Sequence, residues 1–316
     1  MSRVKDKLIN GVAVLGLLAG LGLLLYPTVA DWWNTWHQTR IIGDYEQAVQ
    51  KLGQREHDQI LLDAERFNVQ LASRNHMLIL SDEEREAYYK LLDITDTGIM
   101  GYVSIPKMSV TIPIFHGTSD AVLTIGAGHL EGTSLPIGGV GTHASITAHR
   151  GLPRARLFSD LDDMAVGDRF FITVLDRTLT YEVDQVRVVL PDQIDDLAID
   201  PEKDYFTLVT CTPYGVNSHR LLVRGHRVDG TGNGAAVLAE AVRLEPRYVA
   251  PILAIPVSLA LAGWAAALWR VFKRRRREAA EARQGFAERQ ERRAHRSDPA
   301  DPASSAEPAD PASSAY

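Results

Sequence analysis

Two apolar segments, residues 8–30 and 249–272, constrain this chain of 316 residues more than any other feature. The first contains no charged residue, and its length matches the roughly 20 residues that an α-helix needs to cross the hydrocarbon core of a bilayer. Basic residues precede it, and a tryptophan cluster, Trp32, Trp33 and Trp36, follows it, as is typical of a membrane anchor. A cleaved signal peptide is the alternative, but the apolar run is long for one and lacks a small-residue cleavage site before the tryptophans.

The basic residues predict how the two segments are oriented. Positive charge stands before the first segment and after the second, where residues 273–277 read KRRRR. Because cytoplasmic flanks carry the excess of Lys and Arg, we expect a two-pass protein of the cell membrane, with both termini in the cytoplasm and residues 31–247 outside. The basic run is explained as a topology signal attracted to anionic lipid, so it does not indicate nucleic-acid binding.

Changes in composition divide the chain into seven expected parts. These are a cytoplasmic N-terminus (1–7), a transmembrane helix (8–30), an extracellular helical region with a possible lid (31–97), a β-domain (98–230), a linker (231–248), a second transmembrane helix (249–272) and a cytoplasmic tail (273–316). The tail is basic at first and then repeats DPASSA, a composition typical of disorder.

Residues 40–75 have the spacing of amphipathic helices. Two apolar stripes recur at intervals of three and four residues, and Gly53 separates them. The stripes are formed by Ile41, Tyr45, Ala48 and Leu52, and by Ile60, Leu61, Ala64, Phe67 and Leu71. A further short helix is expected after Ser81, because Glu84, three residues on, completes a capping box.

From residue 98 to residue 229 the pattern is that of β-structure. Short runs rich in Val, Ile, Thr and aromatic residues are separated by Gly, Pro and Asp turns. The runs cover residues 98–106, 110–115, 144–149, 170–175, 179–190, 205–211 and 220–228. Short helical stretches, such as residues 157–168, interrupt them without regular alternation of strand and helix. The predicted fold class is therefore mainly β, with a closed or nearly closed barrel favoured over a doubly wound sheet.

Cys211 is the only cysteine in the sequence, and it stands at the end of the run TLVTC. It cannot form an internal disulfide, and it lacks a resolving cysteine for a redox role. A single cysteine is often a small buried apolar residue. A nucleophilic thiol instead needs an imidazole or a guanidinium beside it, because these groups stabilise the thiolate.

Arg220 is the first candidate partner of this thiol. If residues 207–212 and 220–227 pair as a hairpin, Arg220 returns close to Cys211, where a guanidinium would stabilise a thiolate or an oxyanion. Alternation along the strand puts Arg224 on the same face, so the two arginines compete for this role.

A general base is harder to choose among the histidines. His149 stands at the end of a β-run, in the same situation as Cys211, whereas His143 begins that run and His116 and His129 lie in glycine-flanked loops. We favour His149, while each of the four is also explained as a hydrogen-bonded structural residue. Helical HxxxH and CxxC spacings are lacking, so the sequence indicates no metal. No organic cofactor is indicated either.

Several blocks of the sequence, taken in order, resemble the sortases, the cysteine transpeptidases of Gram-positive cell surfaces. The central blocks are ITAHRG at residues 146–151 and TLVTC at residues 207–211, with Arg220 nine residues after the cysteine. The blocks at residues 98–119, 126–139 and 149–158, and the second apolar segment, are similar to the class C branch, which polymerises pilins.

The resemblance implies a closed eight-stranded β-barrel with short helices, and it makes residues 98–230 the catalytic domain. It implies Cys211 as the nucleophile, His149 as the general acid and base, and Arg220 as the group that stabilises the thiolate, the substrate carbonyl or the oxyanion. Thr210, beside the cysteine, is a candidate substrate-binding residue.

The reaction that the resemblance implies begins when the thiolate attacks the Thr–Gly bond of an LPXTG-like sorting signal. The partners are therefore pilin or surface-protein substrates with C-terminal sorting signals. A lysine amine of a second pilin then resolves the acyl-enzyme as an isopeptide bond. His149 would protonate the departing amine and deprotonate the incoming one.

Two features depart from the class C pattern. Residues 70–85 contain no Asp-Pro-aromatic triplet, so a lid over the cysteine is either absent or built differently, with His76, Met77 or Leu78 in the cleft. Ala148 stands where glycine often precedes the histidine.

Three other functions share parts of these observations. A sortase that anchors surface proteins to peptidoglycan, or that hydrolyses its substrate, would use the same three residues. An L,D-transpeptidase also pairs Cys with His on a β-domain, but its cysteine follows the histidine closely in a Ser-x-Gly-Cys context, unlike TLVTC. A non-catalytic membrane scaffold would keep Cys211 as a packing residue.

Overall fold

The computed structural model describes residues 2–74, 79–152 and 155–229, and in the C-terminal part residues 263–264, 267, 269–271, 273–278, 280–281 and 283–289. Residues 1–244 form one unit and residues 245–316 another. The predicted lid residues His76, Met77 and Leu78, the predicted linker and most of the second predicted span lie outside the described residues. The two-pass topology therefore stays a prediction.

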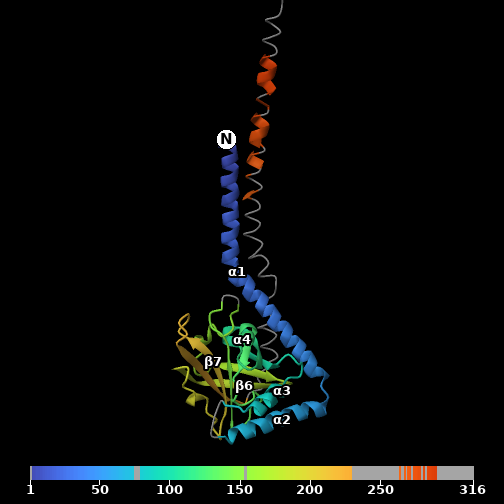
Figure 1. Cartoon of the computed structure of the whole chain (residues 1–316), viewed down its shortest axis with the longest axis vertical. Helices are drawn as coiled ribbons and strands as arrows, with labels where there is room; N and C mark the ends of the chain where they lie inside the picture. Colours follow the sequence, from blue (N-terminus) through green and yellow to red (C-terminus); the bar gives the residue numbers. More distant parts are fainter. Residues whose placement is uncertain are drawn as a thin grey trace, which may run out of the picture. The chain divides into compact units, whose positions relative to one another are not determined.

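The predicted N-terminal anchor is part of one long helix, α1 (Ser2–Lys51). Within the described part of the chain, α1 is the one helix long and apolar enough to cross a membrane. Figure 1 shows that the helix bends partway along, and Pro27, which lies inside it, is the residue type that causes such bends. The predicted span at residues 8–30 and residues 31–51 of the predicted helical region are thus continuous.

The last turns of α1 pack on the barrel through the first predicted apolar stripe. Tyr45 is completely buried, its hydroxyl donates to the carbonyl of Met100 at 2.9 Å, and it accepts from the amide of Leu175 at 2.8 Å. A buried phenol hydroxyl that both donates and accepts a hydrogen bond fixes the helix against β1 and the turn after β5.

The second helix, α2 (Gln54–Ala72), begins after Gly53, so the predicted break at that glycine is confirmed. Its predicted stripe faces the core, where Leu61, Ala64, Phe67 and Leu71 are buried. Asn68 adds a polar attachment, because its amide donates to the carbonyl of Leu135 at 3.1 Å and accepts from the amide of the same residue at 2.7 Å.

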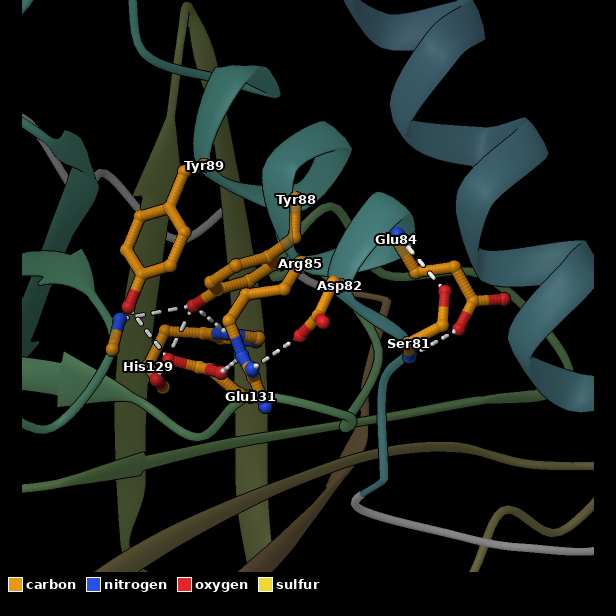
Figure 2. A network of polar contacts seen from close by, with 9 residues as sticks. Ser81, Asp82, Glu84, Arg85, Tyr88, Tyr89, His129 and Glu131 are labelled. Carbon is orange, nitrogen blue, oxygen red and sulfur yellow. Dashed lines mark hydrogen bonds and ion pairs between the residues drawn. The ribbon is translucent and has the colours of Figure 1, made fainter.

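The third helix, α3 (Asp82–Lys90), begins with the predicted capping box. The Ser81 hydroxyl accepts from the amide of Glu84, and the Glu84 carboxylate accepts from the amide of Ser81 (Figure 2). Glu84 also pairs with Arg74, so the end of α2 and the start of α3 are held together. The capping-box prediction is confirmed.

A buried polar network attaches α3 to the barrel (Figure 2). The Tyr88 hydroxyl lies 3.0 Å from Nδ1 of His129 and accepts from the amide of Gly117 at 3.0 Å. On its other side His129 Nε2 donates to the carbonyl of Ser134 at 2.8 Å, which leaves Nδ1 as the acceptor for Tyr88. Burial lowers the pKa of His129 to about 4, so the ring is neutral at physiological pH.

Eight strands form a closed barrel in the order β1-β2-β3-β4-β7-β8-β6-β5, as the resemblance implies. They are β1 (Ile99–Ile105), β2 (Val110–His116), β3 (Ala127–His129), β4 (Thr142–Thr147), β5 (Arg169–Val174), β6 (Arg177–Val189), β7 (Asp204–Thr212) and β8 (His219–Arg227). The connections contain a short helix, α4 (Asp120–Ile125), and three 3₁₀ turns, η1 (Pro106–Met108), η2 (Leu161–Asp163) and η3 (Asp195–Leu197). The helical stretch expected over residues 157–168 is reduced to η2.

The barrel interior is filled by aromatic rings. Phe170 and Tyr181 stack at a centroid distance of 5.6 Å, and Phe206 meets both of them. Gly225 on β8 makes room for this cluster, because a Cβ there would lie 2.8 Å from the Phe170 ring. The interior is therefore a packed core, and functional side chains must lie on the outer face or at the strand ends.

The neutral state of His129 predicts how stability depends on pH. The unfolded chain takes up a proton below the ordinary histidine pKa of about 6.5, whereas the folded chain does so only near pH 4, so stability falls as the pH is lowered through this window. When the pH is lowered from 7.5 to 5.0, we expect His129 to reduce the free energy of unfolding by about 2 kcal/mol. Thermal unfolding of the detergent-solubilised chain, followed by circular dichroism, measures this change. The variant His129→Asn loses this contribution, so its stability deficit relative to the parent shrinks at pH 5.0; an equal deficit at both pH values would contradict the prediction.

Candidate active site

The hairpin of β7 and β8 sets Cys211 directly opposite Arg220. In an antiparallel pair, opposite side chains lie on the same face with Cβ atoms about 5 Å apart. The next pair on that face is Val209 with Leu222, and both of these side chains are buried. The predicted return of Arg220 to the cysteine is confirmed, and both residues belong to the outer face of the barrel.

His149 reaches the same place through a parallel pairing. β4 lies beside β7 with Thr147 opposite Val209, so a chain that continues in register carries His149 to the level of Cys211. The register is maintained beyond the strand, because the amide of Ala148 donates to the carbonyl of Val209 at 3.2 Å. The amide of Phe158 in turn donates to the carbonyl of His149 at 3.2 Å and fixes the backbone there.

These three residues line one cleft, with a volume of about 670 Å³. Its floor is the outer face of β4, β7 and β8, and one wall is the connection between β6 and β7, with Leu190, Pro191 and Ile194. Cys211, His149 and Arg220 are all half-buried, so each is held by its neighbours and remains open to the cleft. A buried apolar cluster of Val189, Val209 and Leu222 continues the floor beyond them. Thr118 and Glu131 also line the cleft.

The structure separates the two competing arginines. Arg224 makes a bidentate ion pair with Asp184, at 3.0 and 3.1 Å, and its guanidinium lies 4.2 Å from the centre of the Tyr205 ring. Arg220 donates to the backbone carbonyls of Asn217 and His219, and among the described residues it has no carboxylate partner. The Arg220 guanidinium is therefore the one available to an anion in the cleft.

The alternative histidines all have structural partners. His116 is buried with both ring nitrogens at backbone carbonyls, 3.0 Å from Gly98 and 2.7 Å from Leu91. His143 is buried between the carbonyl of Ala198 and the hydroxyl of Thr207, and burial lowers its pKa. His129 is enclosed by the α3 network. Of these four histidines only His149 lines the cleft.

Thr210 does not lie with the cleft residues. Alternation along β7 turns it to the barrel interior, where it is completely buried, and its hydroxyl donates to the carbonyl of Ala148 at 2.8 Å. This bond ties β7 to the end of β4 one residue from Cys211 and one residue from His149. The methyl group of Ala148 is also buried, in the main core. The contacts of Thr210 thus support positioning of the two strands rather than contact with a substrate.

Glu131 is a cleft residue that the sequence pattern did not single out. Its carboxylate accepts from Arg85 Nε at 3.0 Å and from the Tyr89 hydroxyl at 2.6 Å, both on α3 (Figure 2). Burial and the Glu131 carboxylate raise the pKa of Tyr89 to about 12, which keeps the hydroxyl protonated as a donor. No sequence signal marked this contact, because 42 residues separate Tyr89 from Glu131.

The arrangement is suited to acyl transfer. A thiol, an imidazole and a guanidinium share one half-exposed cleft, as nucleophile, proton carrier and anion stabiliser require. Within the described part of the chain no group of three or more His, Cys, Asp or Glu residues could hold a metal ion.

Comparison with known proteins agrees with this geometry. The family model for the Sortase domain matches residues 103–228. Sortase A of Bacillus anthracis is 25% identical over 224 residues, which cover 71% of this chain and 96% of that protein.

Solved structures give stronger similarity. Sortase C1 of Streptococcus agalactiae is 50% identical with a TM-score of 0.58, covering 60% of this chain and 99% of that one. Sortase C of Streptococcus pneumoniae is 42% identical with a TM-score of 0.55, covering 60% and 97%. Sortase C of Clostridium perfringens is 38% identical with a TM-score of 0.52, covering 60% and 99%. The chain therefore belongs to the sortase family and is a cysteine transpeptidase.

Proposed function

We propose that this sortase polymerises pilins at the outer surface of the cell membrane, with Cys211 as nucleophile, His149 as general acid and base, and Arg220 as anion stabiliser. The observation that carries the proposal is the meeting of these three side chains in one cleft. It is supported by the similarity to several sortase C structures, one of which is described as informative on pilin substrate specificity.

In the first step the Cys211 thiolate attacks the threonine carbonyl of an LPXTG-like sorting signal. The carbonyl π electrons move to oxygen, and the Arg220 guanidinium stabilises the resulting oxyanion. As the intermediate collapses, the C–N bond to glycine breaks, and the imidazolium of His149 gives its proton to the departing amine. The product is a thioester on Cys211 and a neutral imidazole.

In the second step a lysine amine of another pilin replaces the departed peptide. Neutral His149 takes a proton from the amine as it attacks the thioester, and the C–S bond breaks. The isopeptide bond is formed, and the thiolate and imidazolium are restored without any external oxidant or reductant. The apolar floor of Val189, Val209 and Leu222 offers a surface for the apolar residues of the sorting signal.

The product formed by the full chain tests the acceptor. With a pilin that carries both a sorting signal and its lysine, the detergent-solubilised chain is expected to produce ladders that resist SDS, and replacing the pilin lysine by arginine should remove them. With a peptidoglycan-derived amine also present, formation of its pilin adduct or of hydrolysed monomers alone would replace pilin polymerisation by peptidoglycan anchoring or hydrolysis, since those reactions use the same cleft.

Substitutions in the cleft test the assigned roles. Cys211→Ala and His149→Ala should abolish turnover of a sorting-signal peptide, and Arg220→Lys should lower kcat/KM by roughly tenfold or more, because an ammonium lacks the planar fork. Arg224→Lys is the matched control on the same strand and should stay near the parent value. Full activity of a folded Cys211→Ala protein would favour the non-catalytic scaffold.

Arg150 is a positioning residue in this proposal, since it joins the loops that follow His149 and Cys211. It comes directly after His149, and its Nη1 donates to the hydroxyl of Thr212, directly after Cys211, at 3.3 Å. Its Nη2 pairs with Asp162 at 2.5 Å, and the guanidinium lies 6.0 Å from the centre of the Tyr214 ring. The Arg150 side chain is only 10% exposed, so its position is fixed by the surrounding protein, while Asp162 is 50% exposed.

Removing this connection should affect the chemical step more than binding. We expect Arg150→Met to lower kcat on a soluble sorting-signal peptide roughly ten- to a hundredfold, with KM changed little, because misplacing the thiol and imidazole by a fraction of an ångström is costly. Arg150→Lys should recover part of the loss. Arg156→Met, on the same loop with its guanidinium on Asp160, is the control. Circular dichroism checks that the variants fold, and a loss confined to KM would exclude a positioning role.

A further inference from the structure

The loop that follows His149 touches the anchor helix where it leaves the predicted membrane span. The carboxylate of Asp31 accepts from the backbone amide of Arg156 at 2.9 Å. Asp31 directly follows Ala30, the last residue of the predicted span, and Trp32, Trp33 and Trp36 come immediately after it. If α1 crosses the bilayer as predicted, Arg156 therefore lies at the level of the membrane–water interface.

The β7–β8 loop lies beside the same contact. Leu152 and Ala155 form an isolated antiparallel bridge, so the chain turns back on itself between Gly151 and Arg156. The Tyr214 ring covers Gly151 so closely that a Cβ there would lie 2.6 Å from it, and Gly151 has a φ of +77° that favours glycine. Tyr214 is thus one short hairpin away from Asp31.

The tip of the β7–β8 loop is apolar and exposed. Tyr214 is 63% exposed and Val216 is 69% exposed, and residues 213–218 contain no charged side chain. Exposed apolar side chains such as these are small in area, and they can take part in an interaction surface when further apolar side chains adjoin them. Tyrosine is enriched at the interface of a bilayer, where its ring is partly buried and its hydroxyl stays hydrated.

We propose that the described loop residues 150–152, 155–158 and 213–218 rest on the outer surface of the bilayer, with Tyr214 and Val216 entering the headgroup region. The occupant of this surface is lipid, because the loops are continuous with the Asp31 contact and the tryptophans of the anchor. The end of the cleft that holds His149 and Cys211 then opens beside the membrane surface. This contact goes beyond the proposed reaction and does not require it.

An environment-sensitive fluorophore on a unique cysteine tests the contact directly. Cys211→Ser removes the single native thiol, and Val216→Cys then carries the probe in the full chain, reconstituted in nanodiscs of phosphatidylcholine and phosphatidylglycerol. We expect a blue-shifted emission and at least a twofold greater quenching by lipids spin-labelled near the headgroup than for Asp58→Cys. Asp58 is the control because its side chain is 65% exposed and lies far from Asp31 along the chain. It stands near the start of α2, beyond Lys51, and the axis of α1 from Asp31 to Lys51 is about 30 Å long.

Equal quenching at positions 216 and 58 would overturn the proposal. So would a probe at position 216 whose emission is unchanged by lipid and changes only when a pilin is added, because the surface would then bind protein.

A probe is itself apolar, so Val216→Asp supplies an independent measurement in the active chain. It should leave turnover of a soluble peptide unchanged and lower turnover of a pilin anchored in the same nanodisc severalfold; equal turnover of the anchored pilin by parent and variant would count against the membrane contact. Lipid contact without any turnover would disprove the proposed function alone.

Discussion

Backbone hydrogen bonds on the two sides of β7 decide where the proposed reactive groups of this protein lie. β7 has a parallel neighbour, β4, which carries the chain to His149, and an antiparallel neighbour, β8, which sets Arg220 opposite Cys211. A slip of one residue in either ladder would turn a side chain from the outer face into the packed interior. The Thr210 bond to Ala148 secures the parallel ladder at its open end, where strand pairing stops and the cleft begins.

Local patterns in the sequence predicted the elements that depend on local physics. The spacing of Ser81 and Glu84 predicted a helix start, and Gly53 predicted a break between helices. The expected hairpin of β7 and β8 predicted Arg220 as a partner for Cys211. Each of these predictions involves residues that are near in sequence. The sequence pattern did not reveal β3, because this strand has only three residues. They are an alanine, a glycine and a buried histidine, and none has the β-branched side chain that is typical of a strand. Its parallel pairing with β2 has no sequence signal of its own.

The choice among equivalent residue types required the folded chain. Arg220 and Arg224 share a face by alternation, and only Asp184, distant in sequence, removes Arg224 from the choice. The histidines were likewise distinguished by their partners, because His116, His129 and His143 hydrogen-bond to groups in other parts of the chain. Burial around His129 and His143, which lowers the pKa of both rings, is a tertiary property that spacing cannot reveal. The family resemblance selected the same His149 and Arg220 that the geometry brings together.

Although it bends partway along, α1 is helical from Ser2 to Lys51, so no loop intervenes between the predicted anchor and the barrel. Tyr45 fixes the far end of this helix to β1 and to the turn after β5. A helix that tilts to match the thickness of its bilayer would therefore turn the barrel along with it. If α1 crosses the bilayer as predicted, lipid composition becomes a physical variable of the enzyme, since acyl-chain length would alter the angle at which the cleft meets its substrates.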